Sequence, residues 1–224
     1  MLDEIMSSAN EIKSEIRRFI PETVIEEDLL DKIVEIGNEY GWGRAHMCAE
    51  KHAIKVAELT VDLWTSAENM GLVGKNLDVR RALYTAALLH DVGLWDYRNK
   101  DIHHELSAEI IRDKLQDRSL AERSSIIAYY HRKKPNPLDD ERIKDDRDML
   151  LAIAVLRIAD ALDYRLNRVV NHAFFSEKDE ESITIEVRAK SLDIDVGRVE
   201  KKGKLLEDLL KKKMKIKMFI YRQL

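Results

Sequence analysis

The chain has 224 residues, of which 45% are hydrophobic and 36% charged, and its formal net charge is −4. This length suits one domain, or one domain with a small appendage, and the hydrophobic content excludes a disordered chain. Eight glycines and three prolines are too few for the turns of a many-stranded sandwich or barrel. We therefore predict a mainly helical fold.

The sequence has no feature of a membrane-spanning or secreted protein. Its longest apolar run, Met149–Leu156, ends well short of the roughly 18 residues that a membrane helix needs. The N-terminus carries acidic residues and no apolar signal region, and a single cysteine, Cys48, agrees with a reducing compartment. We predict a cytoplasmic protein in which Cys48 is a small buried residue.

Apolar residues recur at helical intervals along the first three quarters of the chain. The predicted helices span Leu2–Ile20, Asp28–Tyr40, Arg44–Met70, Val79–Val92, Glu105–Leu115, Leu120–Tyr130 and Asp148–Asn167. The Gly41–Gly43 segment lacks the spacing of a phosphate-binding loop and is interpreted as a turn between helices. Gly93 is expected to cap the helix that ends at Val92.

Past Asn171 the pattern changes to a strand over 182–189, an amphipathic helix over 196–214 and a second strand over 215–221. The charged segment Glu177–Glu181 is interpreted as a linker. These features predict a helical domain over residues 1–175 and a small strand-helix-strand appendage over residues 176–224.

The end of the chain is basic, since Arg198–Leu224 carries ten basic and three acidic residues. A polyanion partner is one hypothesis. However, Lys215 and Lys217 alternate with apolar residues, as the solvated face of a half-buried strand does, and no nucleic-acid recognition motif is present. We favour the solvated-face interpretation and predict no nucleic-acid partner.

Three predicted helices carry side chains that suit a metal site. His90 and Asp91 end the most apolar helix, where an ionised carboxylate is costly unless it is paired or binds a cation. Asp160 interrupts another apolar helix, and His52 lies on a third. Such a nitrogen and oxygen set suits Mn, Fe, Co, Mg or Zn. The structural alternative for Asp160 is an ion pair with Arg157, one turn earlier.

The order H, HD, D resembles the HD-domain superfamily of metal-dependent phosphohydrolases. The resemblance is closest to the C-terminal HD domain of the exopolyphosphatase and guanosine pentaphosphate phosphatase family, through HAIKVAEL, AALLHDVGL, HHELSAEII, AYYHRKKP and VLRIADALDYR. It implies an HD-domain helical bundle that hydrolyses a phosphate ester or anhydride, such as a nucleotide, an alarmone or polyphosphate. The actin-like half of that family is not in this sequence, so polyphosphatase activity does not follow.

The resemblance also implies the ligands and the number of metals. His52, His90, Asp91 and Asp160 correspond to the signature ligands, and His103 and His131 match two further histidines that bind a second metal in some subfamilies. Asp91 would bridge the two ions, and His104 stays an alternative to His103. The implied cofactor is one or two divalent cations.

Leu94 stands where many HD phosphohydrolases have a lysine, so the cations that bind phosphate have to come from other positions. We take Arg132 and Arg165 as catalytic cations, together with Asp91. The neighbouring Lys133, Lys134 and Arg168 could also border the cleft. The alternative interpretation for all five residues is a solvated loop and a solvated helix face.

The rival hypothesis is a regulatory module that binds a metal or nucleotide without turnover, although the intact ligand set argues against it. The sequence leaves a homodimer open. Other residues are weaker candidates. His46 lies off the face of His52, and His172 is interpreted as part of a polar linker. Asp163 suits either orientation of a ligand or an ion pair with Arg165 or Arg168. Ser124 and Ser125 have no base arranged for nucleophilic chemistry.

Overall fold

A computed structural model describes residues 2–43 and 49–221. The predictions for His46, Cys48 and the first turn of the helix expected from Arg44 lie outside the described residues. The helices are α1 (Leu2–Arg17), α2 (Glu27–Glu39), α3 (Ala49–Asn69), α4 (Leu77–Leu89), α5 (His103–Lys114), α6 (Arg118–Tyr129), α7 (Arg147–Leu162), α8 (Val196–Lys202) and α9 (Lys204–Leu210). The short 3-10 turns are η1 (Gly41–Gly43), η2 (Val92–Leu94), η3 (Tyr97–Asn99) and η4 (Pro137–Asp139). The strands are β1 (Val170–Lys178), β2 (Ser182–Ala189) and β3 (Lys213–Ile220).

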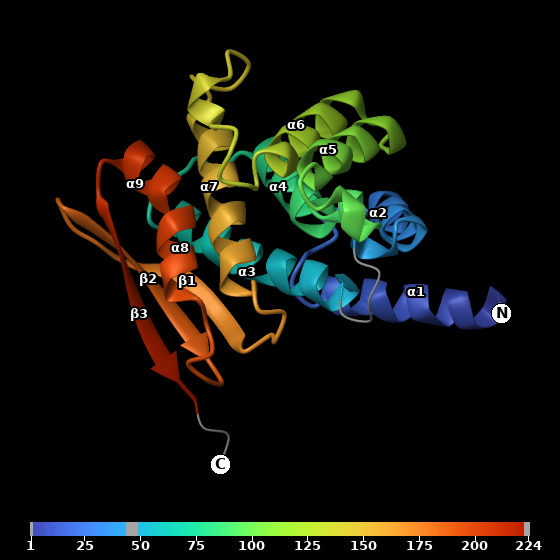
Figure 1. Cartoon of the computed structure of the whole chain (residues 1–224), viewed down its shortest axis with the longest axis horizontal. Coiled ribbons are helices and arrows are strands. Elements are labelled where there is room, and N and C mark those ends of the chain that lie inside the picture. Colours follow the sequence, from blue (N-terminus) through green and yellow to red (C-terminus); the bar gives the residue numbers. More distant parts are fainter. Residues whose placement is uncertain (1, 44–48, 222–224) are drawn as a thin grey trace.

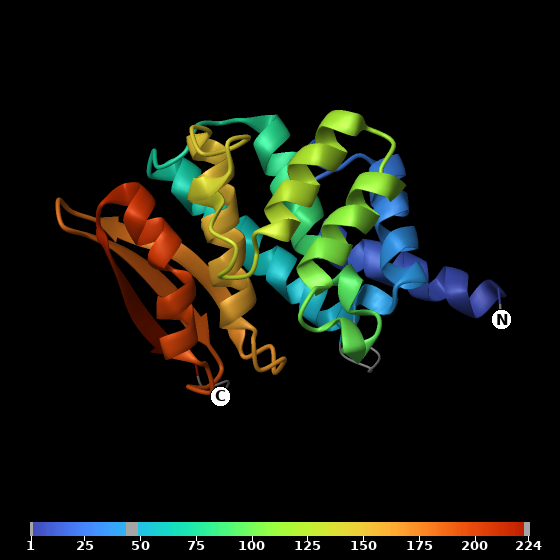
Figure 2. The same cartoon turned by 45° about the horizontal axis from the view of Figure 1, so that its top comes forward.

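The core is built around α3 and α7, which contact each other between two groups of elements (Figure 1). The α2 and α4–α6 helices lie on one side of this pair, and the sheet lies on the other, in both views (Figure 2). Every residue of α7 from Met149 to Ala159 is buried. A helix that is apolar on all sides needs such a central position. The mainly α fold class with a small C-terminal sheet is therefore confirmed.

The sheet has the order β1-β2-β3, with β1 antiparallel to β2 and β2 parallel to β3. A parallel pair needs a crossover connection, which α8 and α9 provide. Along β3, Met214 is buried and Ile216 and Met218 are half-buried, whereas Lys215 and Lys217 are exposed. The alternation predicted for the basic tail is therefore present.

The strand-helix-strand prediction missed β1, and the assignment of His172 to a polar linker was wrong. His172 lies within β1, where it is exposed while its neighbour Ala173 is buried against the core. The register of β1 against β2 shifts between Val170 and His172 and again between Phe175 and Glu177. Such irregularities break the two-residue alternation by which a strand is recognised. The segment interpreted as a linker, Glu177–Glu181, is instead the end of β1 and its turn into β2.

Two predicted helices were too long. The helix expected over 196–214 is interrupted at Gly203, where a Cβ would lie 2.3 Å from the end of the Met214 side chain. The helix expected to reach Asn167 ends at Leu162, and the chain then turns towards β1 through Leu166 and Arg168, which adopt positive φ angles.

The predicted domain division at residue 175 falls inside β1, and the division into two domains stays a prediction. Among the described helices, none combines the length and hydropathy required to cross a membrane.

Candidate metal centre

The predicted ligands lie at helix ends and helix faces that converge on one point. His52 comes from the first turn of α3 and Asp160 from the last turn of α7. His90 and Asp91 directly follow α4. The two remaining histidines lie at either end of the α5–α6 pair, with His103 as the first residue of α5 and His131 two residues after α6.

One group of ligand atoms joins α3, α4 and α7. Single ligand atoms of His52, His90 and Asp91 lie within 4.8 Å of one another, and all three residues are buried. The Nε2 atoms of His52 and His90 lie 3.7 Å and 3.9 Å from Oδ1 of Asp160. Asp160 therefore completes a set of two imidazoles and two carboxylates.

A second group shares Asp91 with the first. Ligand atoms of Asp91, His103 and His131 also lie within 4.8 Å of one another. Oδ1 of Asp91 is 3.4 Å from His103 Nε2 and 3.7 Å from His131 Nε2, whereas Oδ2 is 3.9 Å from His52 Nε2. Oδ1 is also 3.8 Å from Nε2 of His90, so Asp91 lies within reach of imidazoles from both groups, as a bridging carboxylate would.

Backbone and side-chain oxygens hold each imidazole in one orientation. Nδ1 of His90, His103 and His131 lies 2.9, 2.8 and 2.6 Å from the carbonyl oxygen three residues earlier. Nδ1 of His52 lies 2.9 Å from Oδ2 of Asp163, which is 1% exposed. Because these oxygens only accept, each Nδ1 carries a proton, and in the neutral form of each ring Nε2 presents a lone pair to the site. Asp163 thus has the orienting role expected for it.

The arrangement of Nε2 atoms fits a metal better than a hydrogen-bond network. Within the described residues, Nε2 of His52 and of His90 are buried and have no hydrogen-bond partner. Nε2 of His103 and of His131 face each other at 3.0 Å. Two lone pairs at that distance repel each other unless a cation or a proton lies between them. A set of imidazole and carboxylate ligands suits Mn, Fe, Co or Zn, and Mg is compatible with the carboxylates.

The site also sets the charges of its own ligands. Burial lowers the pKa of His90 and of His131, so both imidazoles are neutral at pH 7, as metal ligands must be. Burial alone would also lower the pKa of His52, but Asp160 and Asp163 raise it to about 9. Although burial favours its neutral form, the surrounding histidines hold the pKa of Asp91 well below its ordinary value. A cation therefore has to displace a proton from His52.

Two residues that the sequence left as alternatives make other contacts in the structure. His104, the alternative to His103, belongs to neither ligand group and packs against the Tyr129 ring at a centroid distance of 5.3 Å. Burial lowers its pKa to about 4. Arg157, the structural alternative for Asp160, instead donates hydrogen bonds to the carbonyls of Tyr130 and Pro135, at 2.6 and 3.4 Å.

Asp160 is paired with Lys202 of α8, which the sequence analysis did not single out. Lys202 Nζ lies 3.2 Å from Oδ2 of Asp160. Burial would raise the pKa of Asp160, but Lys202 holds it well below the ordinary value. In the sequence Lys202 belongs to a lysine-rich stretch that predicts a solvated surface. The only signal for a buried role is its position four residues after Arg198, on the same helix face.

Two glycines let the backbone approach the cluster closely. From the sequence, Gly43 was predicted only to be part of a turn and Gly93 only to cap a helix. Gly43 has a φ of +92°, and a Cβ there would lie 1.6 Å from the Asp91 carbonyl oxygen. Gly93 is not the expected cap, because α4 ends at Leu89. Instead it lies in η2 against α5, where a Cβ would meet the His103 carbonyl oxygen at 2.2 Å. Each position therefore requires glycine.

The two arginines predicted to be catalytic lie outside the ligand groups. Arg132 donates hydrogen bonds to the carbonyls of Lys100 and Asp101, just before His103. Arg165 is half exposed and pairs with Asp193 at 3.2 Å. These contacts place Arg132 beside an element of the site, and a catalytic role for either residue stays a prediction. Ser124 and Ser125 are buried in α6.

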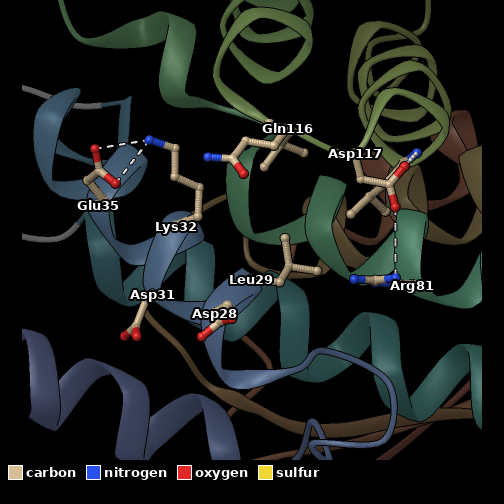
Figure 3. Close-up of a pocket in the computed structure, with 10 residues that line it drawn as sticks. Asp28, Leu29, Asp31, Lys32, Glu35, Arg81, Gln116 and Asp117 are labelled. Atoms are coloured by element: carbon tan, nitrogen blue, oxygen red, sulfur yellow. Dashed lines mark hydrogen bonds and ion pairs between the residues drawn. The ribbon is translucent and has the colours of Figure 1, made fainter.

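A cavity of about 380 Å³ elsewhere on the molecule contains none of the cluster residues. It lies between α2, α4 and the α5–α6 connection (Figure 3). Its walls carry two ion pairs, one between Lys32 and Glu35 and one between Arg81 and Asp117. The ligand cluster is therefore the stronger candidate for chemistry.

A family model described as HD domain matches residues 50–165, more than half of the chain. The chain therefore belongs to the HD domain family, whose members are generally metal-dependent hydrolases. The matched segment contains every proposed ligand from His52 to Asp160, but it ends before Lys202. No curated protein sequence matches the chain.

Proposed function

We propose that this protein is a phosphohydrolase that uses two divalent cations. The first would be held by His52, His90, Asp91 and Asp160, and the second by Asp91, His103 and His131. Two neighbouring cations lower the pKa of a bound water and stabilise both the attacking and the leaving oxygen of a phosphoryl group. The residues of this chain would hold the cations, fix the imidazole orientations and neutralise phosphate charge.

The observation that supports this proposal most directly is the position of Asp91. Its carboxylate lies within 3.9 Å of the Nε2 atoms of four histidines, two from each ligand group. A buried carboxylate among four imidazoles is more than a single structural ion pair needs. Shared by two ligand groups, it fits the bridge of a paired metal site.

For the substrate we propose a phosphate ester or anhydride of the nucleotide, alarmone or polyphosphate kind, following the resemblance to the exopolyphosphatase and guanosine pentaphosphate phosphatase family. Arg132 is the proposed cation near the second metal, because it is fixed to the segment before His103. Arg165 is the proposed cation beyond Asp160. Cationic side chains of this kind bind phosphate oxygens through charge-assisted hydrogen bonds.

The test is elemental analysis of the purified protein, followed by a panel of nucleotides, alarmones and polyphosphate with each divalent metal. We expect about two metal equivalents and metal-dependent release of phosphate. Protein that neither contains a divalent metal nor gains thermal stability when one is added would refute the metal centre. If substrates bind but none is cleaved with any metal, the regulatory module replaces the enzyme.

A further inference from the structure

Lys202 enters the ligand cluster from the C-terminal part of the chain. Its Nζ lies 3.2 Å from Oδ2 of Asp160 and donates a hydrogen bond of 2.7 Å to the carbonyl of His131. Its side chain is only 10% exposed. The ammonium group therefore contacts two residues that are themselves proposed ligands, one in each group.

A second contact holds α8 beside the end of α7. The Arg198 guanidinium lies 3.4 Å from the centre of the Tyr164 ring. Arg198 precedes Lys202 by four residues, so the two side chains share one face of α8, and Tyr164 lies in the turn just after α7. This stacking supports the position of α8 from which Lys202 reaches the Asp160 carboxylate.

The two oxygens of Asp160 have different surroundings. Oδ1 faces Nε2 of His52 and of His90, at 3.7 and 3.9 Å, whereas Oδ2 faces Lys202. A carboxylate binds a cation through one oxygen or through both. An ion pair that only fastened α8 to α7 would not need to divide the carboxylate in this way, and buried ion pairs are weak contributors to stability.

We infer that Lys202 is a positioning residue that withholds Oδ2 of Asp160 from the metal, so that only Oδ1 binds. One coordination position then stays open for water or a phosphate oxygen, as catalytic metal sites require. The β2–α8–α9–β3 unit, outside the matched HD segment, thereby contributes to the active site. This inference rests on the metal centre proposed above.

The experiment compares Lys202→Met with Lys201→Met in the full-length protein, because Lys201 is the exposed neighbour on the same helix. Co²⁺ affinity, the visible spectrum of bound Co²⁺ and the affinity of the Co²⁺-loaded protein for inorganic phosphate are measured. We expect Lys202→Met to bind Co²⁺ about threefold or more tightly, because a nearby positive charge is lost and Oδ2 can now bind. Its Co²⁺ absorption should weaken as the coordination number rises, and its phosphate affinity should fall by about tenfold or more.

Lys202→Arg keeps the charge and the donors, and we expect it to restore the wild-type spectrum. If Lys202→Met does not fold, Lys202→Gln, which keeps a polar end, is expected to show the same changes in Co²⁺ and phosphate affinity. A Co²⁺ spectrum and phosphate affinity equal to those of Lys201→Met would overturn the inference. So would a folded variant that loses Co²⁺, because Lys202 would then only support the structure around Asp160. Wild-type protein that binds no Co²⁺ would instead remove the metal centre, and this inference with it.

Discussion

Substituting Gly93 by alanine should remove the second proposed metal and leave the first in place. The added Cβ would lie 2.2 Å from the His103 carbonyl oxygen and 2.5 Å from the Ser107 amide nitrogen, both backbone atoms of α5. Contacts of this kind are ordinary only beyond 3.4 Å, so the first turn of α5 has to move by about 1 Å. Because His103 begins α5, its Nε2 would leave its position 3.4 Å from Asp91.

The expected magnitude follows from the cost of overpacking, about 1–3 kcal/mol. For a chain of this size each kcal/mol lowers Tm by about 2–4 °C, so the expected decrease is about 2–12 °C. The hydrogen bond from the Gly93 amide to Ser107 Oγ, 2.9 Å long, should weaken as well. The second metal should be lost, whereas the first should stay, because His52, His90 and Asp160 do not lie on α5.

Thermal unfolding and metal stoichiometry after dialysis measure these two effects. The control is Gly197→Ala, where the nearest atom to the new Cβ is 3.8 Å away. We expect the control to retain both metals and the wild-type Tm. Gly93→Ala protein with two metals and an unchanged Tm would show that α5 is not held against η2 as the structure describes.

Three further predictions concern two ligands of the cluster and the arginines proposed to bind phosphate. Asp91→Ala should cost more metal affinity than His103→Ala, because the carboxylate contacts both ligand groups; full metal content and activity in His103→Ala would indicate a single metal. Since the pKa of His52 is about 9, its imidazole is protonated below that pH, and Co²⁺ affinity should fall about tenfold per pH unit as the pH drops from about 8.5 to 7. A titration that is flat over this range would contradict that proton displacement. Arg132→Ala or Arg165→Ala should lower kcat by about tenfold or more, about 1.4 kcal/mol, with unchanged metal content; loss of metal would show a structural role instead.

The sequence predicted the helical part of the fold well because its helices follow strong apolar periodicity. The stretch that became α7 was predicted as an apolar helix, and it is buried on all sides. The sheet was predicted less well, because β1 carries two register shifts that hide its alternation. A Cβ at Gly203 would meet the side chain of Met214 from β3, a contact that local patterns do not contain.

The candidate ligands could be proposed from the sequence because each residue is chemically unusual where it stands, as Asp91 is at the end of a buried helix. The structure then added two contacts that the order of residues along the chain does not contain. The choice of His103 over His104 depends on which side of α5 faces Asp91, and the partner of Asp160 is a lysine 42 residues away. Contacts between distant segments leave little trace in one sequence, which is why Lys202 was missed and Arg157 was named as the alternative partner of Asp160.

The last prediction tests how much the orientation of one imidazole matters. Asp163 accepts a hydrogen bond from His52 Nδ1 through Oδ2 and one from the Arg168 amide through Oδ1, each 2.9 Å long. Asp163→Ala leaves both buried or half-buried donors unpaired, at a cost of about 1–3 kcal/mol each, and frees the His52 ring to rotate or change tautomer. We expect metal affinity to fall by about 10- to 100-fold.

Asp163→Asn is the matched control, because its amide oxygen can still accept the proton of His52 Nδ1, and we expect it to recover most of the metal affinity. Its amide nitrogen then faces the Arg168 amide, so it should recover less of the stability than of the binding. Metal titrations and thermal melts of both variants distinguish the two effects. If Asp163→Ala binds metal as tightly as wild type, the backbone packing around α3 alone fixes His52, and Asp163 serves only the turn that ends α7.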